Sequence, residues 1–227
     1  MNIQAIIPSA GQGRRFGALK QFLSLGERPI LLYALEVFSS CPLIQGIGLV
    51  VPEAEIEKTR GLLGSSFGGK IKMIAGGSTR QESVARGFFA AEPSDLIIVH
   101  DGVRPFVSPS LIERVIITAE KFGASVPGLP VRETTKEVSD DNFVAKTVDR
   151  SQLWSIQTPQ AFHYTILKKA IERARQDHFT GTDESMLVER IGVRVKVVEG
   201  DPENIKITRP EDLRMARRIL NDRRSGA

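Results

Sequence analysis

Near its N-terminus the chain reads Ile6-Ile7-Pro8-Ser9-Ala10-Gly11-Gln12-Gly13-Arg14-Arg15-Phe16-Gly17-Ala18-Leu19-Lys20-Gln21, an apolar strand that runs into a glycine loop carrying two arginines and a lysine. Glycines let the backbone approach a ligand closely and turn its N–H groups toward an anion. Arginine and lysine supply positive charge where a polyphosphate would lie. An ordinary glycine turn with solvated basic residues is the alternative, but the strand, the arginine pair and the lysine together favour a phosphate-binding loop.

Two familiar phosphate-binding signatures do not match this loop. Its spacing, Gly11-x-Gly13-x-x-Phe16, has phenylalanine where the dinucleotide fingerprint has its third glycine. The chain also lacks the Gly-x-x-x-x-Gly-Lys-Ser/Thr sequence of P-loop NTPases. A nicotinamide-dependent dehydrogenase on a Rossmann fold is an alternative from another class of enzyme, and Phe16 and the crowded basic residues argue against it.

Composition predicts an ordinary globular protein. With 227 residues the chain can form one large domain, or a domain with an appendage, around a substantial core. There is no apolar run of about 18 residues, so we expect no membrane span. Because a strand is predicted from residue 3 and Cys41 is the single cysteine, we expect no signal sequence and a reducing, cytoplasmic location.

The positive charge of the chain favours small anionic ligands over nucleic acid. The formal net charge is +4 and the sequence pI is about 9.3, but the basic residues are dispersed along the chain. Aromatic residues make up 6%, too few and too scattered for a platform on which the bases of a single strand would stack. We therefore expect no nucleic-acid partner.

Predicted strands and helices alternate along the chain. Short β-branched or apolar runs predict strands at Ile3–Pro8, Ile47–Val51, Ile71–Ile74, Leu96–His100, Ser125–Pro127 and Val193–Val198. Apolar residues at three- and four-residue spacing predict helices at Ile30–Phe38, Gln81–Ala91, Pro109–Phe122, Ile166–Ala174, Met186–Ile191 and Leu213–Leu220. This alternation predicts a Rossmann-like α/β fold, a three-layer sandwich with a mostly parallel sheet, in which ligands bind beyond the carboxyl ends of the strands.

One segment, residues 131–150, interrupts the alternation. Two polar extended stretches, Val131–Val138 and Phe143–Val148, flank Ser139-Asp140-Asp141-Asn142, which is a good hairpin turn. A two-stranded hairpin alone is marginally stable in water. The segment is therefore predicted to be an extended β-arm that packs on a second copy of the chain, the alternative being a solvated excursion stabilised by its own domain.

Further candidate site residues lie where predicted strands end. After the third strand, Gly76-Gly77 and Arg80 open a helix whose free N–H groups could meet an anion or a base edge. Asp101 ends the most apolar strand and is suited to hold Mg²⁺, although an ion pair with Arg104 would also explain its spacing. Lys206 is expected to follow a short strand within residues 203–208.

Taken together, these segments resemble the nucleotidyltransferases that activate sugar and alditol phosphates, and more closely the 2-C-methyl-D-erythritol 4-phosphate cytidylyltransferase family of non-mevalonate isoprenoid biosynthesis. The resemblance covers nearly the whole chain. Each motif is weak alone, but in order they are specific: Pro8-Ser9-Ala10-Gly11-Gln12-Gly13-Arg14-Arg15, Lys20-Gln21, Gly76-Gly77 with Arg80 and Ser83, His100-Asp101 with Arg104-Pro105, Pro130-Val131-Arg132-Glu133-Thr134, Thr147-Val148-Asp149-Arg150, Leu153-Trp154, Thr158-Pro159-Gln160, Thr182-Asp183-Glu184 and Asn204-Ile205-Lys206-Ile207-Thr208-Arg209-Pro210.

The resemblance implies a reaction and a set of site residues within one nucleotidyltransferase domain, residues 1–227. CTP and methylerythritol phosphate would give a cytidine diphosphate alcohol and pyrophosphate, with Mg²⁺, in a homodimer joined by the β-arm. The implied catalytic cations are Arg15, Lys20 and Lys206. The implied nucleotide-binding residues are Ser9, Ala10, Gly11, Gly13, Arg14, Gly76, Gly77, Arg80 and Ser83. The implied substrate-binding residues are Asp101, also a metal ligand, and Arg104, Thr158, Thr134 and Arg150, the last two reaching the neighbouring subunit.

The expected chemistry needs no general base. A phosphate monoester has a second pKa near 6 and is mostly a dianion at neutral pH. The three histidines, His100, His163 and His178, have no convincing serine or cysteine partner, so we interpret them as structural. Two alternatives stay open within this interpretation: a cytidylyltransferase for ribitol 5-phosphate or another alditol phosphate, and a nucleotide sensor without catalysis.

Overall fold

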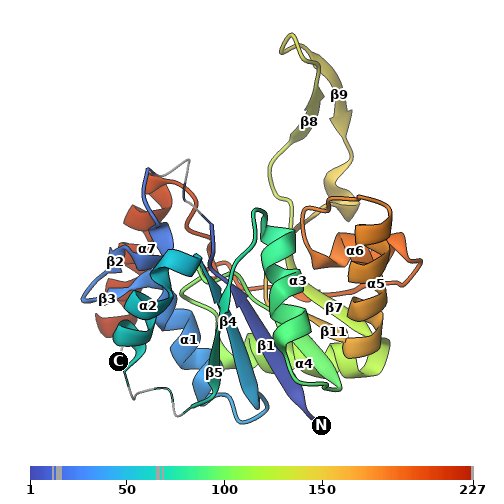
Figure 1. Ribbon diagram of the computed structural model, residues 1–227. Helices are drawn as coiled ribbons and strands as arrows, with labels where there is room; N and C mark the ends of the chain where they lie inside the picture. Colours follow the sequence, from blue (N-terminus) through green and yellow to red (C-terminus); the bar gives the residue numbers. More distant parts are fainter. Residues whose placement is uncertain (12, 14–16, 65–66, 68, 226–227) are drawn as a thin grey trace.

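The computed structural model describes residues 1–11, 13, 17–64, 67 and 69–225. In this part of the chain a central sheet of eight strands is covered by helices on both faces, which is the predicted three-layer α/β sandwich (Figure 1). The strands of the sheet are β1 (Ile3–Pro8), β4 (Gly46–Val51), β5 (Ile71–Ala75), β6 (Leu96–Val99), β7 (Ala124–Pro130), β10 (Trp154–Ile156), β11 (Gln160–His163) and β12 (Lys196–Glu199).

The sheet is mostly parallel, as the alternation of elements predicts. Its strands lie in the order β10-β7-β11-β6-β1-β4-β5, and β12 pairs with β7. Parallel pairs join β1 to β4 and β6, β4 to β5, and β7 to β12. The carboxyl ends of β1, β4, β5 and β6 therefore meet at one edge, where ligands bind in sheets of this kind. β10 and β11 run antiparallel to their neighbours.

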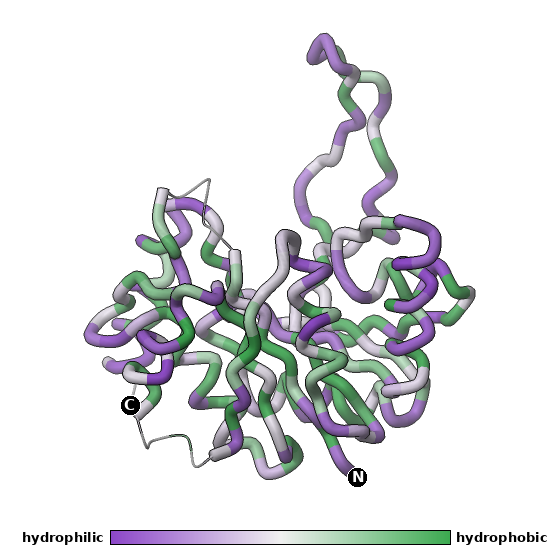
Figure 2. Tube along the Cα trace, in the orientation of Figure 1, coloured by the Kyte–Doolittle hydropathy of each residue, from purple (hydrophilic) through white to green (hydrophobic). Residues whose placement is uncertain are grey.

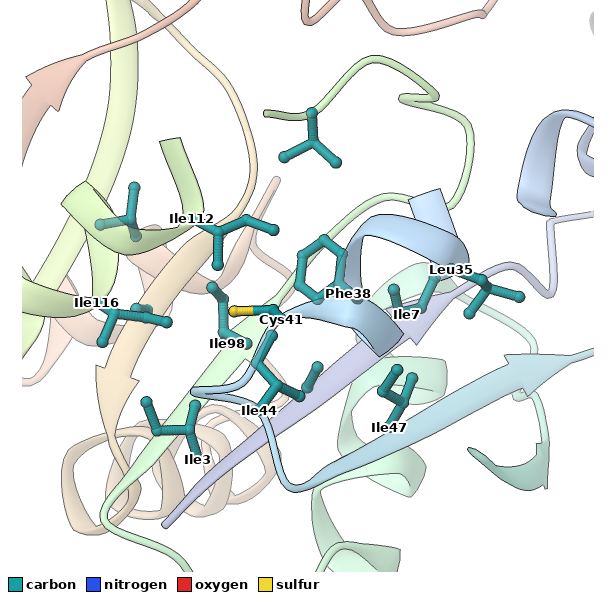
Figure 3. Close-up of a cluster of buried hydrophobic side chains, with 14 of the residues drawn as sticks. Ile3, Ile7, Leu35, Phe38, Cys41, Ile44, Ile47, Ile98, Ile112 and Ile116 are labelled. Atoms are coloured by element: carbon teal, nitrogen blue, oxygen red, sulfur yellow. The ribbon is translucent and has the colours of Figure 1, made fainter. Parts of the chain in front are cut away.

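Alternate side chains of the central strands face opposite helical layers. On one face, Ile3 and Ile7 of β1 pack with helices α1 (Ile30–Ser40), α2 (Ile56–Leu63) and α4 (Pro109–Phe122) (Figure 3). On the other face, Ile6 packs with α3 (Arg80–Ala90), α5 (Tyr164–Gln176) and α6 (Glu184–Arg190). Because β1 is buried on both faces, its sequence is apolar at every position except Gln4 and shows no polar alternation.

Helix α4 shows how local sequence sets the bounds of an element. The side chain of Ser108 accepts a hydrogen bond from the Leu111 N–H at the N-terminus, and Pro109 occupies the first turn, where its missing N–H costs nothing. Gly123 ends the helix in the left-handed region, at φ 88°. The bounds Pro109–Phe122 are those predicted from the sequence.

Several elements differ from the prediction. Helix α2, which contains the weak helix former Gly61, was not predicted. Strands β10 and β11 were not predicted either, because they are short and pair with strands distant in sequence. The last strand of the sheet is Lys196–Glu199 and not Val193–Val198. Residues 203–208, all of which the structure describes, form a loop where a short strand was expected.

The predicted hairpin forms a separate two-stranded sheet. Its strands are β8 (Thr135–Val138) and β9 (Val144–Val148), and they project from the body of the molecule (Figure 1). Asn142 in the turn has a positive φ of 66°, which asparagine tolerates better than most residues. Figure 2 shows hydrophobic residues concentrated along the central strands, whereas the arm mixes polar and apolar positions.

The remaining elements form a smaller unit around the C-terminal helix, α7 (Pro210–Ser225). Ala216 and Leu220 of this helix pack against a small apolar cluster that includes Ile207 and Leu25, the latter in the ribbon of β2 (Ser24–Leu25) and β3 (Arg28–Pro29). Short 3₁₀ turns occupy Lys20–Phe22, Glu53–Glu55 and Arg150–Gln152. Within the described residues we find no helix with the length and apolar character needed to cross a membrane.

The packing of α4 on the sheet leads to a stability prediction. Ile112 is fully buried in this layer, so Ile112→Ala is expected to lower the free energy of unfolding by about 2–5 kcal/mol through lost burial and a new cavity. Ile117→Ala is the matched control, because Ile117 lies on the same helix with 55% of its surface exposed. Urea unfolding of both variants measures the difference, and equal losses would show that α4 does not pack as described.

Candidate active site

The predicted phosphate-binding loop lies at the carboxyl edge of the sheet and opens onto a cavity of about 420 Å³. Loops that follow β1, β5 and β6 meet there, as the parallel order of these strands requires. Many of the predicted site residues line this cavity: Ser9, Ala10, Gly11, Gly13, Lys20, Gly77, Arg80, Ser83, Asp101 and Lys206.

A buried amide holds the first loop in shape. Gln21 is 1% exposed, and its Nε2 donates to the carbonyl oxygens of Ser9, at 2.7 Å, and Gly11, at 3.3 Å. In a trans peptide the C=O and the following N–H point in opposite directions. Since the Ser9 carbonyl points at Gln21, the Ala10 N–H points away from it. Gly13 has a φ of 62°, and a side chain there would meet the backbone of Ala18.

The loop after β5 packs directly on the first loop. A Cβ on Gly76 would lie 2.1 Å from the Cβ of Ala10, so only glycine allows this approach. The structure differs here from the expectation of free N–H groups. The N–H of Gly77 donates to Ser83 Oγ at 3.0 Å, and the N–H of Ser78 donates to Glu82 Oε2 at 2.7 Å, because side chains of the first turn of α3 cap this loop.

Asp101, two residues after the end of β6, lies among three basic side chains. Its Oδ1 accepts from Arg80 Nε at 2.9 Å, its Oδ2 pairs with Lys206 Nζ at 2.7 Å, and Arg104 Nε lies 3.8 Å from Oδ2. Burial by itself would raise the pKa of this carboxyl, but the neighbouring cations outweigh burial and hold the pKa well below its ordinary range. Asp101 is therefore a fixed anion that gathers positive charge at the cavity.

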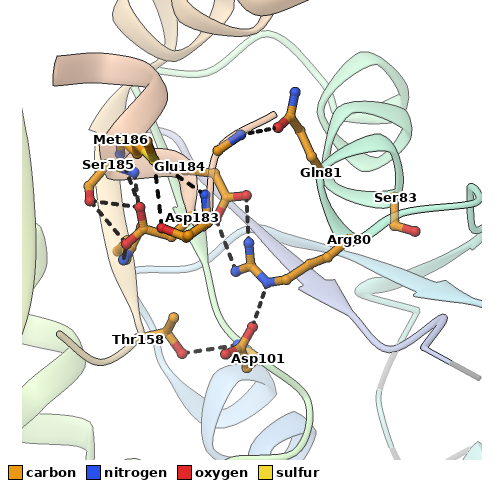
Figure 4. Close-up of polar contacts among 12 residues, drawn as sticks. Arg80, Gln81, Ser83, Asp101, Thr158, Asp183, Glu184, Ser185 and Met186 are labelled. Carbon is orange, nitrogen blue, oxygen red and sulfur yellow. Dashed lines mark hydrogen bonds and ion pairs between the residues drawn. The ribbon is translucent and has the colours of Figure 1, made fainter. Parts of the chain in front are cut away.

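Arg80 is held on its other side by Glu184. The two terminal nitrogens of Arg80 donate to the two carboxylate oxygens of Glu184 at 2.8 and 3.0 Å (Figure 4). Arg80 thus bridges two carboxylates, one at the start of α6 and one in the loop after β6. The predicted nucleotide-binding role of Arg80 stays a prediction, since its Nε and both terminal nitrogens are already engaged.

Lys206 reaches the cavity from a loop that is tied to the protein by side chains. Arg104 Nη1 donates to the carbonyl oxygen of Asn204 at 2.7 Å, and Asn204 Nδ2 donates to that of Thr158 at 2.7 Å. The backbone N–H of Ile207 donates to the Val103 carbonyl oxygen at 3.0 Å. These bonds replace the strand expected in this segment.

A second cavity, of about 510 Å³, lies beside the first. Arg104 and Thr158 line it, and it shares Arg80, Asp101 and Lys206 with the first cavity. These shared side chains form a charged wall between two spaces, each large enough for part of a small ligand.

A protein-built metal cage is not present in the described part of the chain, where no group of three or more His, Cys, Asp or Glu side chains is placed to hold an ion. One carboxylate, that of Asp101, lies at the wall. Mg²⁺ commonly binds through one or two carboxylates together with substrate phosphates, so this donor suits the ion. Both of its oxygens, however, already accept from cations.

His100 is buried beside this wall and serves the loop geometry. Its Nδ1 lies 3.1 Å from Thr158 Oγ1, and its Nε2 lies 3.1 Å from the carbonyl oxygen of Arg104. Burial lowers its pKa to about 4, so the imidazole is neutral at neutral pH. These contacts agree with the structural interpretation of this histidine.

Some predicted site residues are not accounted for by the described cavities. Arg14 and Arg15 lie outside the described residues. Thr134 and Arg150 are exposed at the β-arm, and Arg150 Nη1 donates to the carbonyl oxygen of Arg132. Within one chain they do not line either cavity.

Sequence reasoning missed the role of several polar residues that shape the site. Gln21 and Glu184 appeared only inside quoted motifs, with no function assigned, and Asn204 likewise. Each is buried, and its partners lie 10 to 104 positions away in sequence. The available signals were a glutamine directly after Lys20 and a glutamate two residues before the predicted helix Met186–Ile191, which begins at Glu184 in the structure.

The clamp made by Gln21 leads to a second stability prediction. Gln21→Met keeps the length of the side chain but leaves the Ser9 carbonyl without its buried donor, which is expected to cost about 1–3 kcal/mol of unfolding free energy. Gln176→Met, at the exposed end of α5, is the matched control. Urea unfolding compares the two, and equal stabilities would refute the clamp.

Comparison with known proteins gives consistent matches over almost the whole chain. The IspD family model, described as 2-C-methyl-D-erythritol 4-phosphate cytidylyltransferase, matches residues 3–222. Proteins of that name from Syntrophotalea carbinolica and Geobacter metallireducens are 41% and 42% identical to the chain. The first alignment covers 97% of both chains, and the second covers 98% of this chain and 99% of the relative.

Solved structures agree with these matches. A 4-diphosphocytidyl-2C-methyl-D-erythritol synthase from Anaerococcus prevotii superposes with a TM-score of 0.87 at 34% identity, covering 96% of each chain. A 2-C-methyl-D-erythritol 4-phosphate cytidylyltransferase from Thermus thermophilus gives 0.80 at 34% identity, covering 96% of this chain and 98% of the other. The family model and the relatives together show that the chain belongs to the 2-C-methyl-D-erythritol 4-phosphate cytidylyltransferase family.

Proposed function

We propose that this chain transfers CMP from CTP to 2-C-methyl-D-erythritol 4-phosphate, giving 4-diphosphocytidyl-2-C-methyl-D-erythritol and pyrophosphate. The observation that carries the proposal is the charged wall of Arg80, Asp101 and Lys206 between two cavities. One cavity has a phosphate-binding loop suited to a nucleotide, and the other has Arg104 and Thr158 suited to a sugar phosphate. Membership of the family favours this reaction over the ribitol 5-phosphate alternative.

The two cavities suggest where each substrate lies. The backbone of residues 9–11 and 13, with Gly76, Gly77 and Ser83, is proposed to hold the cytidine and its phosphates. The α-phosphate would then lie at the wall, next to the second cavity. A phosphate oxygen of methylerythritol phosphate attacks the α-phosphorus, the bond from that phosphorus to the bridging oxygen breaks, and pyrophosphate leaves with the bonding electrons.

The main task of the protein in this step is to neutralise charge. The attacking phosphate is mostly a dianion at neutral pH, so no general base is needed to deprotonate it. The neutral His100 is therefore not required as a base. Two like-charged phosphates must approach, and negative charge grows on the leaving pyrophosphate. Fixed cations stabilise such a transition state, and we assign this role to Lys206, Lys20 and Arg15.

We also propose that Mg²⁺ takes part and enters bound to the triphosphate. When bound, it would draw negative charge from the phosphate oxygens. Asp101 is the carboxylate placed to help hold it, because it lies at the wall where the α-phosphate would lie. A protein site made of Asp101 alone would be weak, since Arg80 and Lys206 already occupy both carboxylate oxygens.

A homodimer joined by the β-arm completes the proposal. The arm exposes large apolar side chains at Val138, Phe143 and Val144, with Phe143 72% exposed. A lone hairpin with such a surface needs a partner for stability. A second copy would cover these side chains, and its Thr134 and Arg150 could then reach the sugar-phosphate cavity. A cytoplasmic location is proposed as well, since the buried free thiol of Cys41 suits a reducing compartment.

The first test is substrate choice. Pyrophosphate release is measured with each of the four nucleoside triphosphates and Mg²⁺, with methylerythritol 4-phosphate and ribitol 5-phosphate offered in parallel. We expect release with CTP and methylerythritol phosphate, none after chelation of Mg²⁺, and recovery when Mg²⁺ is restored. Preference for ribitol phosphate would keep the mechanism and change the substrate, whereas no release with any pair would leave a sensor.

A mixing experiment tests the shared site. Lys206→Ala is expected to lose turnover by about 10²–10³-fold, because a charge-neutralising group is gone. Arg150→Ala is expected to raise the KM for the sugar phosphate, because that residue would contact it. In a mixed dimer one of the two sites combines the intact Lys206 of one subunit with the intact Arg150 of the other.

At random exchange half of the dimers are mixed, so the rate, measured at a methylerythritol phosphate concentration well below the KM of the Arg150→Ala variant, should return to about a quarter of the wild-type rate. The control is a mixture of Lys206→Ala and Lys20→Ala, both changed in the body of the subunit, which should gain nothing. If the mixture of Lys206→Ala and Arg150→Ala shows only the mean activity of its two components, the site is not shared between subunits.

A further inference from the structure

We propose that Glu184 is a positioning residue for the reaction: it fixes Arg80, Arg80 fixes Asp101, and Asp101 fixes the ammonium group of Lys206. This inference rests on the proposed function, in which Lys206 neutralises charge at the reacting phosphate. Glu184 lines neither of the two cavities, so it would act entirely through its neighbours.

The first link is the bidentate pair between Glu184 and Arg80. Glu184 is 1% exposed, and its two oxygens accept from both terminal nitrogens of Arg80. A guanidinium is planar, and two parallel bonds fix its plane as well as its position. Figure 4 shows Arg80 extended between Glu184 and Asp101. Because Nε points at Asp101 while the terminal nitrogens are held, the guanidinium cannot rotate without breaking both contacts.

The second link is the division of the Asp101 carboxylate. Arg80 takes Oδ1 with one bond, from Nε at 2.9 Å, and this leaves Oδ2 for Lys206 at 2.7 Å. A lysine ammonium is a point charge on a flexible stem, so its location depends on its partner. Lys206 lies in a loop, outside the sheet, and its side chain is 37% exposed. The carboxylate is therefore what places Nζ at the wall.

Glu184 is itself held firmly, as a positioning group must be. It is the first residue of α6, and Asp183 caps that helix by accepting from the Met186 N–H at 3.0 Å. Gln160 of β11 donates to Asp183 at 2.7 Å and accepts from the Ser185 N–H at 3.3 Å. The helix start is thus anchored to the sheet next to β6, the strand that precedes the loop with Asp101.

Loss of the Glu184 charge has a definite consequence for Lys206. Without the Glu184 carboxylate, the two terminal nitrogens of Arg80 lose their anionic acceptor, while the Asp101 carboxylate is still beside them. Arg80 can then turn and take both oxygens of Asp101, which is the bidentate arrangement that arginine favours. Lys206 would lose its partner and move away from the reacting phosphate. Turnover should fall although every group that touches a substrate is still present.

The test compares Glu184→Gln with a matched control. Glu184→Gln keeps the shape and removes the charge, and we expect turnover to fall about 10–100-fold, as is typical when a residue that orients a functional group is replaced. Glu36→Gln is the control, since Glu36 also pairs with an arginine through both oxygens, Arg28 at 3.4 and 2.7 Å, but at an exposed place on α1. The control should retain wild-type turnover.

A double variant separates positioning from a purely structural role. In the Lys206→Ala background, Glu184→Gln should cause no further loss of turnover, because the group it positions is already absent. Independent effects would multiply, and that result would overturn the proposal. Urea unfolding confirms that each variant is folded in the assay, and lower stability with unchanged turnover would also overturn it.

Arg80→Lys is the second variant in case Glu184→Gln does not fold. It keeps the charge but cannot bond both carboxylates in the same way, and it should show the same lack of additivity with Lys206→Ala. The wild-type reaction with CTP and methylerythritol phosphate runs beside every assay. A silent wild type would refute the proposed function, whereas an active wild type with a fully active Glu184→Gln would refute the positioning role alone.

Discussion

The Asp101 carboxylate is the interaction on which the site depends. It lies at the end of a buried strand, and it collects Arg80, Lys206 and Arg104 around one anion. Positive side chains repel one another, so they can share a small space only if a fixed negative charge holds them. Their combined charge holds the pKa of Asp101 low, and the carboxyl therefore stays ionised throughout the neutral range.

The parallel sheet is what brings these charges together. The loops after β1, β5 and β6 open at one edge because these strands run in the same direction. Helices on both faces bury the strands, so the loops at the edge rest on a rigid support. The antiparallel strand β11 lies between β7 and β6, and the segment that joins β10 to β11 places Thr158 next to Asp101, where its hydroxyl accepts from the Asp101 N–H at 3.0 Å.

Prediction from sequence worked best where one element carried its own signal. The bounds of β1 and α4 agree with the structure, because a mostly apolar strand and a capped amphipathic stripe are complete within a single element. The predicted site residues that follow strands also lie close together, because the carboxyl ends of parallel strands all lie at one edge of the sheet. Prediction failed for β10, β11 and the loop at residues 203–208, whose conformation depends on partners such as β7, β6 and Arg104 that are distant in sequence.

The sequence by itself determined that the chain alternates strands with helices, and it predicted a phosphate-binding loop after the first strand, because residue type and spacing within about fifteen residues are enough for both inferences. Only the tertiary structure decided that Arg80 lies between Asp101 and Glu184, the latter 104 positions away. A charged side chain in a sequence does not specify its partner. Burial does so, because a carboxylate removed from water must find a cation, and the fold alone decides which one is within reach.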